Sequence, residues 1–286
     1  MKTITIDHKN DLHLIASCPV VAALGFFDGV HLGHQKVIQT AKKLADKKGL
    51  KTAVISFFPH PKEIIGKTGE RVHYLLPPAE KAKKFSRLGV DYFYLIRFTP
   101  EFARLEPKEF VWKYLVPLQI KHAVAGYDFT YGRKGKGSLD TMEEDSGYSI
   151  TVTKVENVER NDEKISSTLI RNKIQLGLME ELPDYLGEFY ETKGKMIRTD
   201  GKDELILDRY YMIPPKGCYD VAIDRGEGWF DGRVLVTEQK KIYWLGPPIP
   251  SVWNIFRVKV KWISRNIHFI LEIEEKQTKN LVSVHG

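Results

Sequence analysis

The 286-residue sequence predicts an α/β protein, in which a Rossmann-like domain with a parallel sheet is followed by a small all-β barrel domain. Between residues 20 and 190, apolar runs of strand length alternate with amphipathic helical patterns, which is typical of a parallel sheet covered by helices. Beyond residue 190 the apolar runs are short, aromatic and β-branched, and Gly, Asp, Pro and Asn separate them. Such segments favour a barrel. We expect the domains to span residues 1–187 and 188–286.

The elements of the first domain are expected to follow one another as strand, turn and helix, with ligands bound at the carboxyl ends of the strands. Gly49 and Gly89 are expected to close the first two helices. Strands are predicted over 20–27, 51–58, 91–98, 122–129 and 148–158, and helices over 34–49, 77–89, 106–116 and 166–177. Strands of the second domain are predicted over 194–199, 204–208, 210–213, 218–224, 229–238, 240–245, 253–264 and 265–275.

Composition and charge indicate a folded protein of the cytoplasm. Hydrophobic residues make up 42% of the chain and charged residues 28%, which is ordinary for a globular protein. The net charge is +7, but bases and acids are mixed, as in EKAKKF and EEKQTKN, so we expect solvated faces and neither a nucleic-acid nor a membrane partner. Cys18 and Cys218 belong to no CxxC motif or zinc cluster, and no apolar stretch is long enough to span a bilayer.

The segment GFFDGVHLGH, residues 25–34, lies where a predicted strand becomes a helix. Glycines allow a tight turn there, and the free N–H groups of a helix start attract phosphate. His31 and His34 are three residues apart and face the same way, so each can donate a ring N–H to a phosphate oxygen. A histidine at a helix start is more often a cap or a surface residue, and the spacing indicates no third ligand for zinc. The combination nevertheless predicts a phosphate site.

Five segments together resemble the bacterial bifunctional FAD synthetases, the riboflavin kinase/FMN adenylyltransferase family. GFFDGVHLGH resembles the family's GxFDGVHxGH motif, which is shared by a wider nucleotidyltransferase superfamily. Further segments match in the family's order across about residues 15–190, namely FFPHPKEII, RLGVDYFYLIRFTPEFARLEPKEFV, AGYDFTYGRKGKGS and ISSTLIRNKIQLG. The resemblance implies an adenylyltransferase that joins the substrates ATP and FMN, with Mg²⁺, to give FAD and pyrophosphate.

The resemblance also implies roles for individual residues. His31 and His34 would bind the triphosphate and the transition state, and Arg171 would neutralise pyrophosphate. The remaining residues divide into an ATP group, Gly25, Phe26, Asp28, Gly33, Ser167 and Thr168, and a flavin group, Pro59, His60, Pro61, Asp128 and Phe129. The bases of the loop after Phe129 form either a flexible basic loop or a phosphate clamp, and they are Arg133, Lys134 and Lys136. The sequence identifies neither a metal ligand nor an oligomeric state.

The second domain departs from the family. The riboflavin kinase module carries a Gly-x-Pro-Thr-Ala-Asn segment, whereas this chain contains no Pro-Thr pair. The segment IPPKGCYDVAI still resembles a strand of the kinase barrel, so we expect the barrel to be retained and the kinase activity to be lost. Two other functions stay open: a non-catalytic regulatory paralogue that binds flavin or nucleotide, and an adenylyltransferase with a different phosphorylated acceptor.

Overall fold

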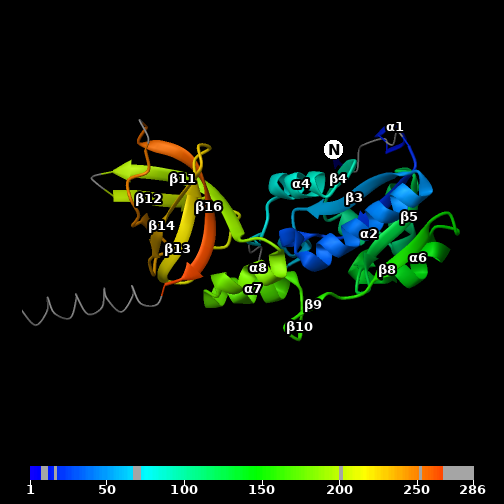
Figure 1. Ribbon diagram of the computed structural model, residues 1–286. Helices are drawn as coiled ribbons and strands as arrows, with labels where there is room; N and C mark the ends of the chain where they lie inside the picture. The colour runs from blue at the N-terminus through cyan, green and yellow to red at the C-terminus, as the bar shows by residue number, and fades with distance from the viewer. Residues whose placement is uncertain (8–11, 16–17, 67–71, 200–201, 251–252, 267–286) are drawn as a thin grey trace, which may run out of the picture. The chain divides into compact units, whose positions relative to one another are not determined.

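The computed structural model describes residues 1–7, 12–15, 18–66, 72–199, 202–250 and 253–266. Packing divides the chain into two units, Met1–Ile165 and Ser166–Gly286 (Figure 1). Residues 166–187 pack within the second unit, ahead of its barrel. The functional boundary predicted between residues 187 and 188 stays a prediction.

The first unit is built on a six-stranded parallel sheet in the order β1-β4-β3-β2-β5-β8. The strands are β1 (Lys2–Ile6), β2 (Val20–Leu24), β3 (Lys51–Phe58), β4 (Tyr92–Arg97), β5 (Ile120–Gly126) and β8 (Thr151–Val155). The chain proceeds outward from β2 to β3 and β4, and then returns to the other side of β2 to form β5. This reversal creates a crevice at the carboxyl end of β2, where ligands bind in open α/β sheets.

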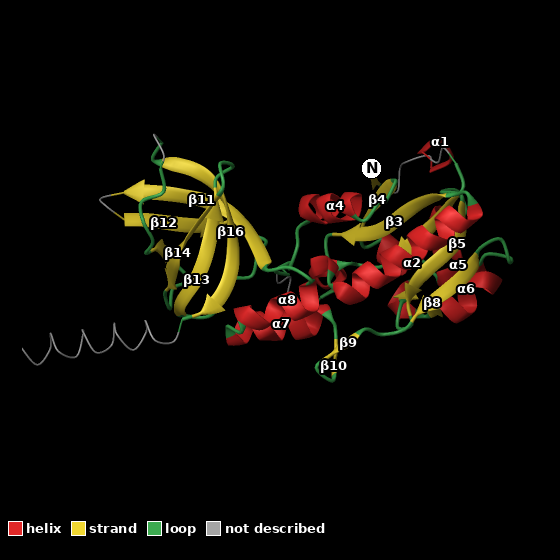
Figure 2. Ribbon diagram, viewed as in Figure 1, coloured by secondary structure: helices red, strands yellow, loops and turns green. Residues whose placement is uncertain are grey.

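Helices cover both faces of this sheet, as Figure 2 shows. On one face α2 (Leu32–Lys48) and α4 (Pro78–Arg87) pack on alternate residues of β2, β3 and β5, and on the other face lie α5 (Pro107–Phe110), η3 (Val111–Leu115) and α6 (Leu139–Asp145). The shorter elements are α1 (Leu12–Ile15), η1 (Asp28–Val30), α3 (Pro61–Ile65), η2 (Phe102–Arg104), β6 (Thr130–Tyr131), η4 (Arg133–Gly135), β7 (Gly137–Ser138), β9 (Glu159–Arg160) and β10 (Glu163–Lys164).

The predicted strands and helices of this unit form, with local differences. The strands β2, β5 and β8 each end three residues before the predicted end, and the helices α3 and α6 were not predicted. The helix predicted over 106–116 begins as α5 and continues as a π-helical turn. The edge strand β1 was not predicted, because its residues are mostly exposed and provide no buried apolar run. Gly49 closes α2 as expected: it has a left-handed φ of 64°, and its N–H donates to the Ala45 and Asp46 carbonyls.

The second unit contains a short helical segment and a closed antiparallel barrel. The helical segment consists of α7 (Ser167–Leu176), η5 (Met179–Glu181) and α8 (Leu182–Leu186). The barrel strands, in their order around the barrel, are β11 (Tyr190–Thr199), β12 (Lys202–Leu207), β15 (Ile242–Trp244), β14 (Trp229–Val236), β13 (Gly217–Asp224) and β16 (Ile255–Arg265). The predicted barrel is therefore confirmed.

Two predicted strands of this unit do not match a strand of the barrel. The strand predicted over 210–213 is wrong, since only Tyr211 makes a bridge, and Pro214 and Pro215 follow without a backbone N–H. Most of the strand predicted over 265–275 lies outside the described residues.

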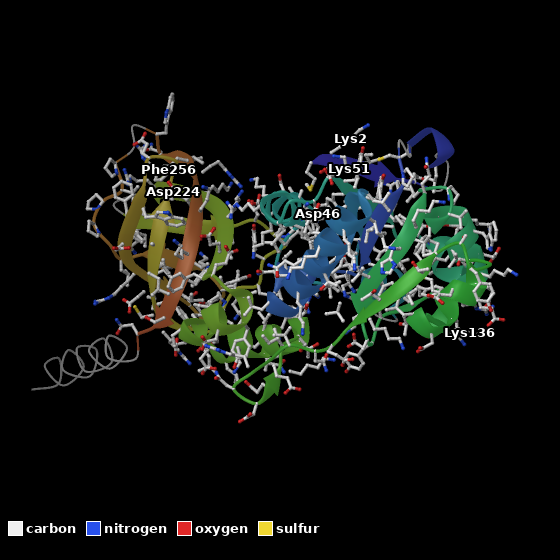
Figure 3. The ribbon with its side chains drawn as sticks, turned by 45° about the vertical axis from the view of Figure 1, so that its right-hand side comes forward. Lys2, Asp46, Lys51, Lys136, Asp224 and Phe256 are labelled. Atoms are coloured by element: carbon white, nitrogen blue, oxygen red, sulfur yellow. The ribbon has the colours of Figure 1, made fainter. Side chains whose placement is uncertain are left out.

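Buried aromatic packing and a glycine hold the barrel closed. Trp262 is buried and donates its indole N–H to Thr192 Oγ1 at 3.0 Å, across the β11–β16 pair. Gly194 lets β12 approach β11, because a Cβ at this position would lie 2.3 Å from the Ile206 carbonyl oxygen. At the end of β16, the Arg265 guanidinium donates to the Leu176 carbonyl oxygen at 3.3 Å and so fastens α7 to the barrel. Figure 3 labels Asp224 and Phe256 on the neighbouring strands β13 and β16.

Replacing Trp262 by Ala is expected to destabilise the second unit by about 3–5 kcal/mol, because it removes the largest buried side chain and leaves a cavity. Thr192→Val should cost about 1–3 kcal/mol, since it leaves the buried indole N–H without its acceptor. Urea denaturation followed by circular dichroism measures both changes. The matched control is Trp253→Ala, at a 71% exposed position, which should leave the midpoint unchanged. Equal midpoints for Trp262→Ala and Trp253→Ala would contradict this role of Trp262.

Candidate functional site

The turn after β2 has a strained backbone. The φ angles of Phe27, Gly29 and Val30 are 53°, 80° and 47°. Glycine adopts such angles freely, but a β-branched valine does so only at a cost of about 1–3 kcal/mol. Gly25, which begins the turn, leaves space for the Phe27 ring, since a Cβ at Gly25 would lie 2.9 Å from that ring. Strain of this kind gathers at functional sites.

A buried carboxylate and two lysines hold this turn. Asp28 is buried, and its two oxygens accept from the backbone N–H groups of Leu75 and Leu76, both at 3.1 Å. From α4, Lys81 Nζ donates to the Phe26 carbonyl oxygen at 2.7 Å, and Lys84 Nζ donates to the Gly29 carbonyl oxygen at 3.2 Å. Asp28, which was predicted to lie beside the nucleotide, therefore binds backbone N–H groups 47 and 48 positions away in the sequence.

His31 and His34 form a stacked pair at the start of α2. Their ring centroids are 3.5 Å apart and their planes differ by 19°. His31 caps the helix, because its Nδ1 accepts from the His34 backbone N–H at 3.3 Å. In neutral His31 the proton is therefore on Nε2, which is free to donate to a ligand. A side chain at Gly33 would press on the His31 ring at 3.2 Å.

Both histidines are neutral at pH 7 in this environment. Burial lowers the pKa of His31 to about 4, and the positive charge of Lys84 contributes to this lowering. The pKa of His34 lies well below its usual value. Burial is the main cause, and electrostatic repulsion from His31, Lys81 and Lys84 lowers the pKa further. His34 Nδ1 is enclosed and has no hydrogen-bond partner in the described part of the chain. An anion bound at the pair would favour protonation of both rings.

An aromatic cavity of about 530 Å³ lies in the first unit and includes Phe26 of the turn. Four of the five residues predicted for the flavin line it: His60, Pro61, Asp128 and Phe129. The fifth, Pro59, does not line it, and the Phe58–Pro59 peptide bond is cis. Most of its other lining side chains are aromatic: Phe57, Phe98, Phe102, Phe110 and Tyr131. The cavity thus offers a large flat apolar surface with a few polar groups.

The basic loop after Phe129 forms the β6–β7 hairpin beside this cavity. Lys134 lines the cavity and has a left-handed φ of 57°. Arg133 and Lys136 each lie 3.5 Å from a carboxylate oxygen of Glu106. Figure 3 labels Lys136 at the surface of the unit. Of the three bases, Lys134 is the one placed to meet a ligand in the cavity.

Three predicted residues belong to the second unit. Ser167, Thr168 and Arg171 lie in the first half of α7, and the cap of that helix is Ser166, whose Oγ accepts from the Leu169 N–H at 3.1 Å. Because this helix belongs to the same unit as the barrel, the roles predicted for the three residues stay predictions.

The sequence reasoning missed three residues around the turn: Tyr74, Lys81 and Lys84. Treating EKAKKF as a solvated face was wrong for Lys81, which is 1% exposed. Helical spacing could have indicated this, because Lys81 and the buried Phe85 are four residues apart on one face of α4. Nothing in the sequence marks Tyr74, whose hydroxyl accepts from the His60 backbone N–H at 2.8 Å and donates to Glu63.

The described residues include no group of three His, Cys, Asp or Glu side chains that could hold a metal ion. The carboxylate of the turn, Asp28, has both oxygens engaged by backbone N–H groups. Within the described part of the chain, no cluster of such side chains is therefore available to hold a divalent cation without help from substrate phosphates.

Comparison with known proteins gives consistent results along most of the chain. Residues 15–169 match the family model described as FAD synthetase. A bifunctional riboflavin kinase/FMN adenylyltransferase of Bacillus subtilis is 38% identical over 93% of this chain and 90% of that protein. An FAD synthetase of Listeria monocytogenes is 34% identical over 78% of this chain and 85% of that protein.

A solved structure also matches both units. It is the crystal structure of a protein from Streptococcus pneumoniae named as a macrolide-efflux protein, and it aligns with a TM-score of 0.81 and 27% identity over 97% of this chain and 98% of that chain. Among the residues described here, none of the helices has the length and apolar character needed to cross a membrane.

The histidine pair predicts a specific pH dependence of stability. Between pH 6.5 and about 4 the unfolded chain binds protons at these positions and the folded chain does not, so stability falls as the pH falls through this window. The slope approaches about 1.4 kcal/mol per pH unit for each histidine. We expect the double variant His31→Asn/His34→Gln to lose a smaller fraction of its free energy of unfolding between pH 7.0 and pH 5.0 than the unsubstituted protein. Urea titrations at the two pH values measure this loss. The exposed control, His73→Asn, should keep the full loss, and identical losses in all three proteins would refute the assignment.

Proposed function

Because this chain belongs to the FAD synthetase family, we propose that it transfers AMP from ATP to FMN, giving FAD and pyrophosphate. One observation carries the proposal: within the first unit, the turn that leads to two stacked histidines at a helix start contains Phe26, which also lines a cavity with aromatic walls. A helix start favours a polyphosphate, and an aromatic cavity favours a flat ring system. Phe26 lies at the boundary between them, with its ring 4.5 Å from that of His60.

The reaction needs alignment and charge stabilisation more than covalent chemistry. A phosphate oxygen of FMN attacks the α-phosphorus of ATP, a new P–O bond forms, and the bond to the β-phosphate oxygen breaks as pyrophosphate leaves. Both reactants are polyanions, so donors that are already in place lower the barrier. His31 is suited to this role because its cap contact places the ring proton on Nε2. His34 is suited because its ring packs edge-on against Phe27 at 5.2 Å and is held there.

We assign Mg²⁺ to the substrate, as MgATP, since the described residues provide no carboxylate cluster for it. The protein's own contribution is then cationic and hydrogen-bonding. In the first unit it comes from the histidine pair and from Lys81 and Lys84 of α4. From the ISSTLIR motif we further propose Ser167, Thr168 and Arg171 as phosphate contacts, with Arg171 neutralising the pyrophosphate.

We propose that riboflavin kinase activity is absent. The support is the lack of any Pro-Thr pair in the chain, while the region that would carry the kinase motif forms the ordinary barrel strands β11 and β12. A barrel fold alone does not confer the activity. We also propose a cytoplasmic location without a nucleic-acid partner, on the basis of two free cysteines and of charges that are mixed in sign.

With MgATP and FMN the purified protein is expected to form FAD and pyrophosphate, and with MgATP and riboflavin it is expected to form no FMN. Chromatography of the two reaction mixtures distinguishes all the products. The appearance of FMN from riboflavin would contradict the loss of kinase activity. ATP binding without FAD formation would favour a regulatory protein, and AMP transfer to another phosphorylated compound alone would favour a different acceptor.

His31→Ala and Arg171→Ala are each expected to lower kcat by at least about 100-fold, because each removes a donor for charge that develops in the transition state. Neither change should alter the far-ultraviolet circular dichroism at assay temperature. Steady-state kinetics with FMN and MgATP provide the measurement. The matched controls are His73→Ala and Arg87→Ala at exposed positions, with kcat expected within twofold of the unsubstituted protein. A variant with near-normal kcat would remove that residue from the mechanism.

A further inference from the structure

A lysine is buried behind the strained turn. Lys81 is 1% exposed, whereas lysine is almost never fully buried unless its charge is engaged. Its Nζ donates to the Phe26 carbonyl oxygen at 2.7 Å and lies 4.1 Å from the centroid of the Phe26 ring. Desolvating an ammonium group is costly, and a surface helix such as α4 could pack with an apolar side chain at this position. The position of Lys81 therefore requires an explanation beyond the stability of α4.

Lys81 contacts Phe26, which belongs both to the histidine turn and to the aromatic cavity of the proposed site. Phe26 is part of the turn and also lines the aromatic cavity. Its carbonyl oxygen accepts a second bond, from Ser56 Oγ at 2.8 Å, so the backbone of Phe26 is fixed from two sides. The ammonium group over the ring adds a cation–π contact, which is stronger when it is shielded from water. Backbone and ring of Phe26 are thus held by the same side chain.

The charge of Lys81 also faces the histidine pair. Lys81 and Lys84 lie three residues apart on α4, and Lys84 Nζ contacts the Gly29 carbonyl oxygen of the same turn. The titratable groups that act on His34 are these two lysines and the neutral His31, and Lys84 also acts on His31. Two ammonium groups behind a helix start increase the positive potential there, which favours a polyphosphate.

We propose that Lys81 is a positioning residue for adenylyl transfer, which fixes Phe26 at the boundary between the histidine turn and the aromatic cavity. This inference rests on the proposed function and extends it to α4. Its contacts with Phe26 are not contacts with substrate, so Lys81 acts through Phe26 and through its charge. Loss of Lys81 should therefore affect both the fit of FMN and the turnover of the bound complex.

The test compares three substitutions on one helix. Lys81→Met removes the charge and keeps the stem, Lys81→Arg keeps the charge, and Lys83→Met changes an exposed lysine that pairs with Glu80. For Lys81→Met we expect kcat to fall at least 10-fold and KM for FMN to rise several-fold. Lys83→Met should stay within twofold of the unsubstituted protein in both parameters, and Lys81→Arg should recover most of kcat.

A second measurement distinguishes a positioning role of Lys81 from a role in the stability of the fold alone. Proton titration of labelled histidines by NMR should show the pKa of His34 raised in Lys81→Met, because a nearby positive charge has been removed, and unchanged in Lys83→Met. A purely structural role would lower the unfolding temperature and leave kcat and KM for FMN of the folded variant unchanged. Kinetics of Lys81→Met equal to those of Lys83→Met, in folded protein, would overturn the proposal.

Two further experiments apply if Lys81→Met does not fold or if the unsubstituted protein forms no FAD. If Lys81→Met does not fold, Phe26→Leu replaces it, since this change removes the ring on which Lys81 acts. We expect Phe26→Leu to raise KM for FMN at least fivefold, and unchanged kinetics would overturn the proposal. If the unsubstituted protein forms no FAD, the proposed function fails. The Lys81 proposal is then judged by the quenching of FMN fluorescence on binding, which Lys81→Met should weaken and Lys83→Met should not.

Discussion

The architecture of the first unit depends on a strained backbone turn that its surroundings keep in place. Three residues after β2 have positive φ angles, and one of them is a β-branched valine. A chain left to itself would relax such a turn. Here Asp28 ties it to Leu75 and Leu76, and the two lysines of α4 bind its carbonyl groups. These hydrogen bonds join the turn to the loop before α4 and to α4 itself. Together they fix the orientation of the start of α2.

That arrangement explains the properties of the histidine pair. A fixed turn lets His31 cap α2 and stack on His34, which in turn buries both rings and keeps them neutral beside two ammonium groups. Neutral rings in a positive environment are poised to receive an anion, because an arriving phosphate offsets the repulsion that keeps protons away. The aromatic cavity starts at the same turn, through Phe26. The histidine pair and the aromatic cavity are thus organised by a single structural constraint.

The second unit is a closed barrel whose described contacts account for its fold without reference to any ligand. Its six strands close into a barrel through a buried tryptophan, a glycine between two strands and an arginine that fastens α7. None of these contacts requires the residues of a phosphoryl-transfer site. Relatives that match along most of the chain carry the name of a bifunctional enzyme, whereas this chain contains no Pro-Thr pair.

Local patterns were enough to establish the alternation of strands and helices, the barrel, and the placing of GFFDGVHLGH at a strand-to-helix turn. These follow from periodicity, glycine and helix-start chemistry, which are properties of short segments. Tertiary contacts alone established that Lys81 is buried, that Asp28 binds backbone N–H groups, and that aromatic side chains from segments as far apart as Phe26 and Tyr131 line one cavity. Each of these features depends on contacts between segments far apart in the chain. Lys81 and Phe26 are 55 positions apart in the sequence, so no local pattern indicates their contact.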